Sequence, residues 1–219
     1  MNLQKAESIM EGTATVVKHT GSHYLLAQLP SWRLFPAVLR GKVRLGGSSA
    51  TNPVAVGDRV EFHADGDLLP DGSVPASETA PAAITRILPR RNYIIRKSVN
   101  LSRQAHIIAA NIDHAFIVVT LAFPEVKLPF IDRLLVTCEV YGVKPVIVLN
   151  KIDIVDEFRD DFAPALENFH RIYEGAGYSI LEVSAKTGRG VDELRRLCLE
   201  KSEDGAPGIS LFSGVSGVG

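Results

Sequence analysis

The run Asn150-Lys151-Ile152-Asp153 holds residue types that suit recognition of a guanine base. The Asp153 carboxylate can accept two hydrogen bonds, from guanine N1–H and the 2-amino group. Adenine offers neither donor on that edge, so binding it would leave a desolvated carboxylate unpaired. The Lys151 stem can lie along the plane of a base, and Asn150 can tie the loop to its neighbours. The pattern favours a guanine-binding loop; the alternative is an ordinary polar turn.

Two further loops extend this chemistry. Ser184-Ala185-Lys186 offers a backbone N–H for guanine O6 and a lysine stem that can cover the second side of the base. The segment GVSGVG supplies the first six residues of the phosphate-binding pattern G-x-x-x-x-G-K-[ST], whose glycines let backbone N–H groups turn toward phosphate oxygens. The alternative for this segment is a flexible glycine-rich tail. Its residues are Gly214, Val215, Ser216, Gly217, Val218 and Gly219.

The three loops match the NKxD, SAK and phosphate loops of GTPases, but their order along the chain is unusual. The common order places the phosphate loop first and the base loops last, whereas here both base loops come first. This order indicates a circular permutation. Such a rearrangement is physically tolerable because strand adjacency does not depend on where a chain begins.

The elements that must position these loops follow from a change of hydrophobic pattern near residue 100. Continuous apolar runs predict strands that are buried on both faces, and they alternate with amphipathic stretches that predict helices. This alternation predicts a parallel sheet with crossover helices, in which ligands bind at the carboxyl ends of the strands. The predicted strands are Ala115 to Leu121, Pro145 to Leu149, Ser179 to Val183 and Ile209 to Phe212. The predicted helices are Phe130 to Tyr141, Asp156 to Glu174 and Val191 to Glu200.

The first part of the chain predicts a small β-barrel. Five short β-like runs are separated by Gly-, Pro- and Ser-rich breaks, which favours an OB-fold first and an SH3-like barrel second. The predicted strands are Thr13 to Lys18, His23 to Leu29, Phe35 to Arg40, Arg59 to His63 and Ile84 to Leu88. The loop Gly46 to Pro53 is small and polar, and Ala64 to Ala83 is expected to be mobile and unpacked. We therefore expect two domains, residues 1–96 and 97–219.

Bulk composition narrows the function classes. The 219 residues carry a formal net charge of −1, so no global field attracts nucleic acid or membrane and any polyanion site must be local. The two cysteines, Cys138 and Cys198, suit reduced core residues of a cytoplasmic protein. The histidines are scattered, so we expect no metal site in this chain. The N-terminus lacks the apolar core of a signal peptide.

One local basic stretch stands between the two predicted domains. Residues 86 to 103 hold six cations and no acidic residue. Their functional interpretation is a stripe that contacts RNA phosphates beside the barrel, with Arg90, Arg91, Arg96 and Lys97 as the predicted contacts. The alternative is a solvated basic linker.

These motifs together give a specific resemblance. The stretches RRNYIIRKSVNLSRQAHIIAANIDHAFIVVTL, FIDRLLVTCE, PVIVLNKIDI, VSAKTGRGVDEL and LFSGVSGVG resemble the bacterial ribosome small-subunit-dependent GTPase A family. The likeness covers residues 84 to 219 and, more loosely, the barrel with its VGDRVEF run. It implies an N-terminal OB-fold, a permuted GTPase domain and a C-terminal zinc-binding domain. It also implies a protein that uses GTP or GDP with Mg²⁺ and binds the small (30S) ribosomal subunit late in its maturation. We further expect a cytoplasmic monomer that contacts 16S rRNA. The subunit stimulates GTP hydrolysis in that family.

The resemblance ends inside the phosphate loop, before the lysine, the switch segments, the DxxG loop and the zinc domain of the family. We therefore expect the 219 residues alone to be inactive, and no catalytic residue is named. One alternative is a non-enzymatic rRNA-binding module with a vestigial nucleotide site. Another is a permuted GTPase family that acts on the large subunit, against which the N-terminal barrel argues.

Overall fold

The computed structural model describes residues 8–40, 54–97, 105–202 and 205–219. The chain separates into two compact units, residues 1–111 and 112–219, which are described one at a time. This division lies later than the boundary expected at residue 96. A β-hairpin that the sequence did not predict accounts for the difference, because it belongs to the first unit.

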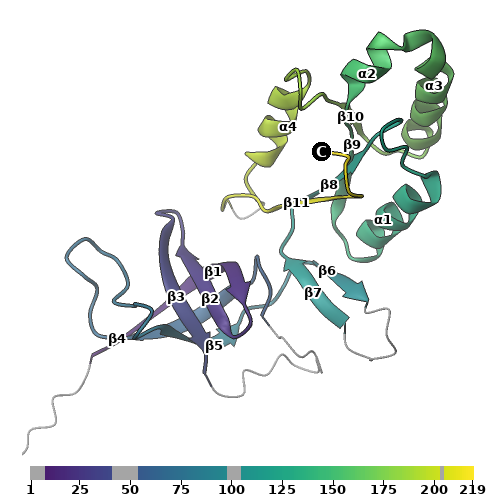
Figure 1. Ribbon diagram of the computed structural model, residues 1–219. Helices are drawn as coiled ribbons and strands as arrows, with labels where there is room; N and C mark the ends of the chain where they lie inside the picture. The colour runs from purple at the N-terminus through teal and green to yellow at the C-terminus, as the bar shows by residue number, and fades with distance from the viewer. Residues whose placement is uncertain (1–7, 41–53, 98–104, 203–204) are drawn as a thin grey trace, which may run out of the picture. The chain divides into compact units, whose positions relative to one another are not determined.

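Five strands of the first unit form a closed barrel in the order β1-β2-β3-β5-β4, with β1 and β4 closing it as an antiparallel pair (Figure 1). The strands are β1 (Ile9–Thr20), β2 (His23–Gln28), β3 (Arg33–Leu39), β4 (Arg59–Asp65) and β5 (Ala82–Ile87). The parallel β3–β5 pair shows that the chain crosses over between β3 and β5. The predicted five-stranded OB-fold is confirmed.

Apolar side chains that alternate along these strands fill the barrel. The rings of Phe35 and Phe62 pack with centroids 4.8 Å apart, and Gly12 leaves room for the Phe62 ring, which a Cβ at that position would approach to 3.1 Å. The loop between β4 and β5 contributes to the same core. The prediction that residues 64–83 are unpacked is wrong, because the side chain of Val74 is buried in the barrel core and Leu69 N–H donates to Ser73 O at 3.0 Å. The loop 46–53 lies outside the described residues.

The hairpin consists of β6 (Tyr93–Lys97) and β7 (Ala105–Ala110), which pair antiparallel. It attaches to the segment before β4: Ala110 N–H donates to Val56 O at 2.9 Å, and the Asn111 side-chain amide donates to Gly57 O at 2.9 Å. β6 ends in two cations, Arg96 and Lys97, so this part of the chain resembled a basic linker in sequence.

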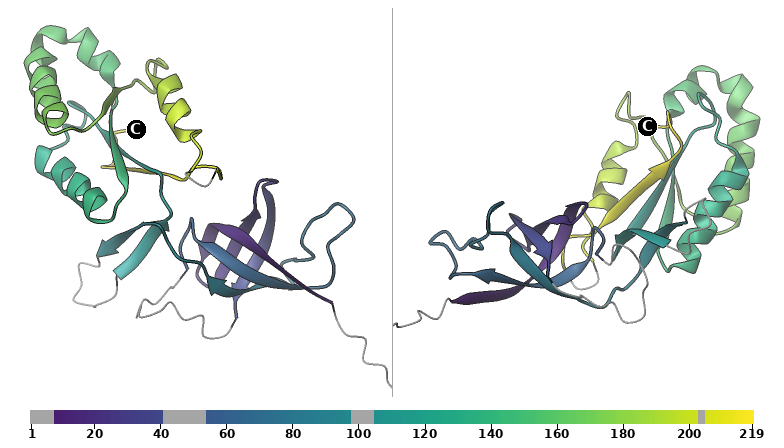
Figure 2. Two further views of the ribbon diagram at one scale, coloured as in Figure 1. Left: turned by 180° about the vertical axis from the view of Figure 1, so that it is seen from behind. Right: turned by 60° about the horizontal axis from the view of Figure 1, so that its bottom comes forward.

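The second unit is built on a four-stranded parallel sheet in the order β10-β9-β8-β11. Helix α4 lies on one face of the sheet, and α1 and α3 lie on the other (Figures 1 and 2). The predicted parallel sheet with crossover helices is confirmed. The strands are β8 (His114–Val119), β9 (Lys144–Leu149), β10 (Ile180–Glu182) and β11 (Ser210–Gly214). The helices are α1 (Leu128–Val140), α2 (Ile152–Glu157), α3 (Arg159–Gly175) and α4 (Val191–Cys198).

The segment expected to be one helix from Asp156 to Glu174 is two helices. Helix α2 begins earlier, at Ile152, and the backbone leaves the helical region at Phe158, with φ −114° and ψ 45°. The early start buries Ile152 and Val155 of α2. Across the described segments, we find no helix with both the length and the apolar character that crossing a membrane requires.

Candidate functional site

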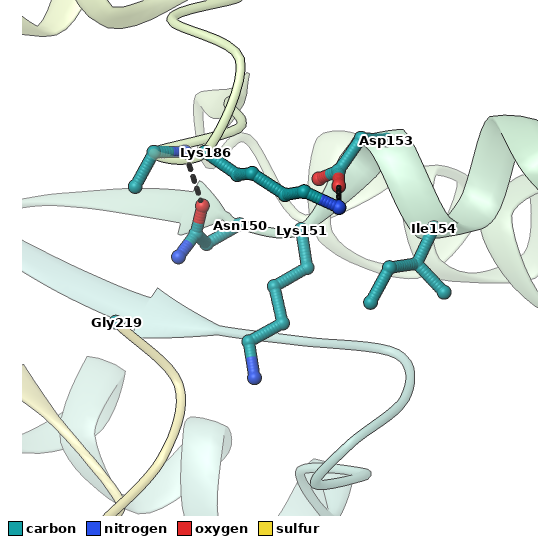
Figure 3. A pocket seen from close by; sticks show the side chains of 7 residues that line it. Asn150, Lys151, Asp153, Ile154, Lys186 and Gly219 are labelled. Carbon is teal, nitrogen blue, oxygen red and sulfur yellow. Dashed lines mark hydrogen bonds and ion pairs between the residues drawn. The ribbon is translucent and has the colours of Figure 1, made fainter.

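The loops that follow β9, β10 and β11 meet at one edge of the sheet. They do so because these strands run parallel, so their carboxyl ends share an edge. A pocket of about 300 Å³ opens between them (Figure 3). Its size is at the lower end of the range for small-molecule sites. The lining residues are Asn150, Lys151, Asp153, Ile154, Ala185, Lys186 and Gly219.

Asn150 joins all three loops. Its buried side-chain amide donates to Val218 O at 2.7 Å, and its Oδ1 accepts a hydrogen bond from Ala185 N–H at 3.1 Å. One side chain therefore fixes both the loop after β10 and the loop after β11 to the end of β9. The tie that the sequence predicted for Asn150 is present, and it reaches two neighbours.

The Asp153 carboxylate is held by the loop after β10. The fully buried Ser184 hydroxyl donates to Asp153 Oδ1 at 2.7 Å, and Ser184 Oγ in turn accepts a hydrogen bond from Thr187 N–H at 3.1 Å. The ammonium of Lys186 lies 4.0 Å from Asp153 Oδ2, at the end of a side chain that extends along the pocket (Figure 3). Asp153 keeps 19% of its side chain exposed, which leaves it accessible to a ligand.

Lys151 occupies the left-handed region, with φ 64° and ψ 33°. Its ammonium donates to Gly217 O at 2.6 Å and to Phe123 O. The lysine therefore links the loop after β9 to the phosphate-loop segment and to the loop after β8. The contribution of Phe123 was not predicted, because a backbone carbonyl leaves no signal in residue types.

Close packing explains the glycines of residues 214–219. A Cβ on Gly214 would lie 2.6 Å from Val118 O, so no other residue fits there without movement of the backbone. Gly217 has a φ of 86°, a conformation that residues with a side chain rarely adopt. Gly219 lines the pocket, whereas Val215 and Ser216 are not among the lining residues.

Two residues next to Asp153 differ from expectation. Ile152, predicted as part of the site, is buried in the core and donates its N–H to Val183 O at 3.1 Å, so its side chain does not line the pocket. Ile154 lines the pocket instead and was missed. An apolar side chain suits contact with a flat base. The sequence could have indicated Ile154, because it is an apolar residue directly after Asp153.

The basic stretch before the hairpin is less free than its sequence indicates. Arg90 makes two hydrogen bonds of 2.6 Å to Asp58, which is fully buried, and only 11% of the Arg90 side chain is exposed. The prediction that Arg90 contacts RNA is therefore corrected: its guanidinium serves a buried ion pair. Arg86 also pairs with an acid, Glu61, at 3.4 Å.

The other three predicted RNA contacts are Arg91, Arg96 and Lys97. Arg91 is exposed and donates from its guanidinium to Asn111 O at 3.1 Å. The side chains of Arg96 and Lys97 lie outside the described residues. Cations that look uncompensated within a window of sequence can therefore have acidic partners more than twenty residues away.

Comparisons with known proteins show the family of the chain. A sequence model of the family described as RsgA GTPase matches residues 87–219. The chain is 39% identical over 207 residues to the small ribosomal subunit biogenesis GTPase RsgA of Flavobacterium psychrophilum, covering 94% of this chain and 57% of that protein. It is 42% identical over 205 residues to the protein of the same name from Porphyromonas gingivalis, covering 93% and 58%.

Two solved structures are similar to this chain. YjeQ from Thermotoga maritima matches with a TM-score of 0.67 at 30% identity, over 96% of this chain and 62% of that one. YloQ, a circularly permuted GTPase, matches with a TM-score of 0.62 over all of this chain and 64% of that one; at 19% identity this likeness concerns the fold. The chain thus spans less than two thirds of the length of these relatives. Because the family match covers more than half of the chain, we conclude that the chain belongs to the RsgA GTPase family.

Proposed function

We propose that the protein binds guanine nucleotides in the pocket of the second unit and hydrolyses GTP during biogenesis of the small ribosomal subunit. One observation carries the proposal: the Asn150 side chain joins the loops after β10 and β11 to the end of β9, around a pocket open to a ligand. The names of the relatives, which are small-subunit biogenesis GTPases, supply the cellular role.

Guanine selection would rest on Asp153. Its carboxylate accepts the Ser184 hydroxyl through Oδ1, and carboxylate oxygens have lone pairs left for N1–H and the 2-amino group of guanine. The backbone of the loop after β10 would receive guanine O6, and the stems of Lys151 and Lys186 would flank the base. An adenine in this position would give the carboxylate no donor from the base, which costs about 1–3 kcal/mol or more for a charged group.

The segment Gly214–Gly219 would begin the cradle for the phosphates. Lys151 holds this segment through Gly217 O, so base binding and the shape of the phosphate loop are mechanically connected. A nucleoside triphosphate carries Mg²⁺, which neutralises part of the phosphate charge. Among the described residues no group of His, Cys, Asp or Glu side chains could hold a metal ion, so we assign the ion no ligand and name no catalytic residue.

We propose these activities for the whole protein. The 219 residues supply the loops that line the pocket and match the first six positions of the phosphate-binding pattern. We propose that a polypeptide of these residues alone binds GTP more weakly than the whole protein and releases no phosphate.

The proposal is tested by measuring GTP hydrolysis by the whole protein with and without purified small subunits. Hydrolysis that rises with small subunits, and not with large subunits, supports it. Equal affinity for GTP and ATP, or hydrolysis that small subunits leave unchanged, contradicts it. Binding to small subunits without any nucleotide preference would instead favour the rRNA-binding module.

We further propose that the barrel unit contacts 16S rRNA through Arg91 and through Arg96 and Lys97 at the end of β6. The support is the exposure of Arg91 and the OB-fold, whose members often bind oligonucleotides. Arg90 is left out because it is engaged with Asp58.

A further inference from the structure

Arg189 connects two elements on which the base pocket depends. Its guanidinium pairs through Nη1 with Asp156 of α2, and through Nη2 with Glu182 of β10 at 3.3 Å. Its backbone carbonyl accepts Ser184 N–H at 2.9 Å, which closes the loop that follows β10. Arg189 therefore joins the loop after β10, the strand β10 itself and helix α2, which carries Asp153.

Helix α2 carries Asp153 in its first turn and Asp156 one turn later. Side chains three residues apart lie on the same side of a helix, so both carboxylates can face the loop after β10. The loop holds the helix at both places, through Ser184 on Asp153 at 2.7 Å and through Arg189 on Asp156. Without the Arg189 contact, the loop after β10 would hold α2 at Asp153, through Ser184 and Lys186, while the turn that carries Asp156 would lose its tie to this loop.

The far side of this clamp is itself fixed. Glu182 Oε1 pairs with His170 Nε2 of α3 at 2.9 Å, so the second carboxylate partner of Arg189 is oriented by a neighbouring helix. The backbone after Arg189 packs closely against β10, with no room for a side chain at position 190. Gly190 has a φ of 71°, and a Cβ there would lie 2.1 Å from Glu182 O.

We propose that Arg189 is a positioning residue for guanine selectivity, which holds α2 so that the Asp153 carboxylate faces the base edge. The inference rests on the proposed function, because it assumes that Asp153 reads guanine. Arg189 is not among the residues that line the pocket, and it acts through Asp156 and α2. Half of its side chain is exposed, so we expect a modest effect, about two- to fivefold in selectivity.

The chain offers a matched control. Arg196 on α4 is similarly exposed and also bridges two carboxylates, those of Glu193 and Glu200. Both partners belong to α4 or the residues directly after it, so removing Arg196 takes away the same charge and a similar number of ion pairs without releasing α2.

The experiment compares the affinity of the whole protein for GDP and for IDP by calorimetry. Inosine lacks the 2-amino group, so the GDP/IDP ratio reports the alignment of Asp153 with that group. We expect Arg189→Ala and Asp156→Asn each to lower this ratio about two- to fivefold, the double variant to lower it no further, and Arg196→Ala to leave it unchanged. Arg189→Lys, which keeps the charge but lacks the forked geometry, should lie between wild type and Arg189→Ala.

Each outcome decides between the assignments. A GDP/IDP ratio that is equal in wild type and in both Arg189 variants overturns the inference, even when GDP is preferred over ADP and the proposed function stands. Lower thermal stability with an unchanged ratio shows a structural role alone and also overturns it. A wild-type protein without preference for GDP over ADP contradicts the proposed function, and the positioning role fails with it. Asp156→Asn keeps the test usable if Arg189→Ala does not fold.

Discussion

The buried amide of Asn150 donates a hydrogen bond of 2.7 Å to the carbonyl of Val218, 68 residues further along the chain. The bond connects a base loop to the phosphate-loop segment across parallel strands. These two loops are far apart in sequence, but they follow parallel strands whose carboxyl ends lie at the same edge of the sheet. The site is therefore defined by which strand ends are adjacent, and its loops can be met in any order along the chain.

Replacement of Asn150 by alanine should weaken nucleotide binding and stability together. The change leaves the carbonyl of buried Val218 and the N–H of exposed Ala185 without their partner, and an unsatisfied buried group costs about 1–3 kcal/mol. Urea unfolding should show a loss of about 1–3 kcal/mol. Asn168→Ala is the matched control, because Asn168 is exposed on α3 and its side chain accepts a hydrogen bond from Arg171 of the same helix. Equal effects of the two substitutions would contradict the joining role of Asn150.

Replacement of Asp153 by asparagine should shift the base preference from guanine toward xanthine. The amide presents a donor where the carboxylate presented an acceptor, and xanthine offers a carbonyl at the position of the 2-amino group. Titration of the whole protein with GTP and XTP measures the change. Asp161→Asn, an exposed acid of α3, removes the same charge away from the pocket and should leave the preference unchanged. An unaltered GTP/XTP ratio for Asp153→Asn would remove Asp153 from the base site.

The parallel sheet and its three loops could be predicted from sequence because both leave local signals. A strand buried on both faces reads as a continuous apolar run, and a loop residue at its end is fixed in place by the strand. Asn150 and Ser184 could be found in this way. Ile152 was misplaced because a motif pattern does not show which of its side chains turns toward the core.

Features that depend on partners far along the chain could not be predicted. The Arg90–Asp58 ion pair spans 32 residues, and a window of sequence counts only the cation. The contacts of Arg189 with Asp156 and Glu182 could not be predicted either, because these charged residues lie in separate elements and their spacing in the sequence matches no known motif. The core position of Val74 in a polar loop depends on how that loop folds back onto the barrel.

His170 should make stability depend on pH. Burial lowers the pKa of this imidazole, but its hydrogen bonds to Glu174 and Glu182 outweigh that effect and raise the pKa above the ordinary 6.5. A raised folded-state pKa means that the contribution is fully present below the unfolded value, about 6.5, and is lost as the pH rises through the folded value. Replacement by glutamine should therefore cost a few tenths to about 1 kcal/mol at pH 5.5 and less at pH 8.5.

Urea unfolding of His170→Gln and wild type across that pH range measures this difference. His23→Gln, which changes an exposed histidine of β2, is the control. A destabilisation by His170→Gln that grows with pH would contradict the assigned ion pairs.

Arg90 and Arg91 are adjacent in sequence, and the structure predicts opposite consequences for their removal. Arg90→Ala would leave the fully buried Asp58 carboxylate without its two charged hydrogen bonds, and breaking such a pair typically costs about 3–5 kcal/mol. Arg91→Ala removes an exposed side chain, so stability should change by less than about 0.5 kcal/mol. Its effect should appear instead in the salt dependence of binding to small subunits, because each lost phosphate contact lowers the log–log slope by about 0.7–0.9. Co-sedimentation across a salt series, together with thermal unfolding of both variants, separates the two roles. A folded, stable Arg90→Ala protein with weakened subunit binding would show that Arg90 contacts RNA after all, and an Arg91→Ala slope equal to that of wild type would remove Arg91 from the RNA surface.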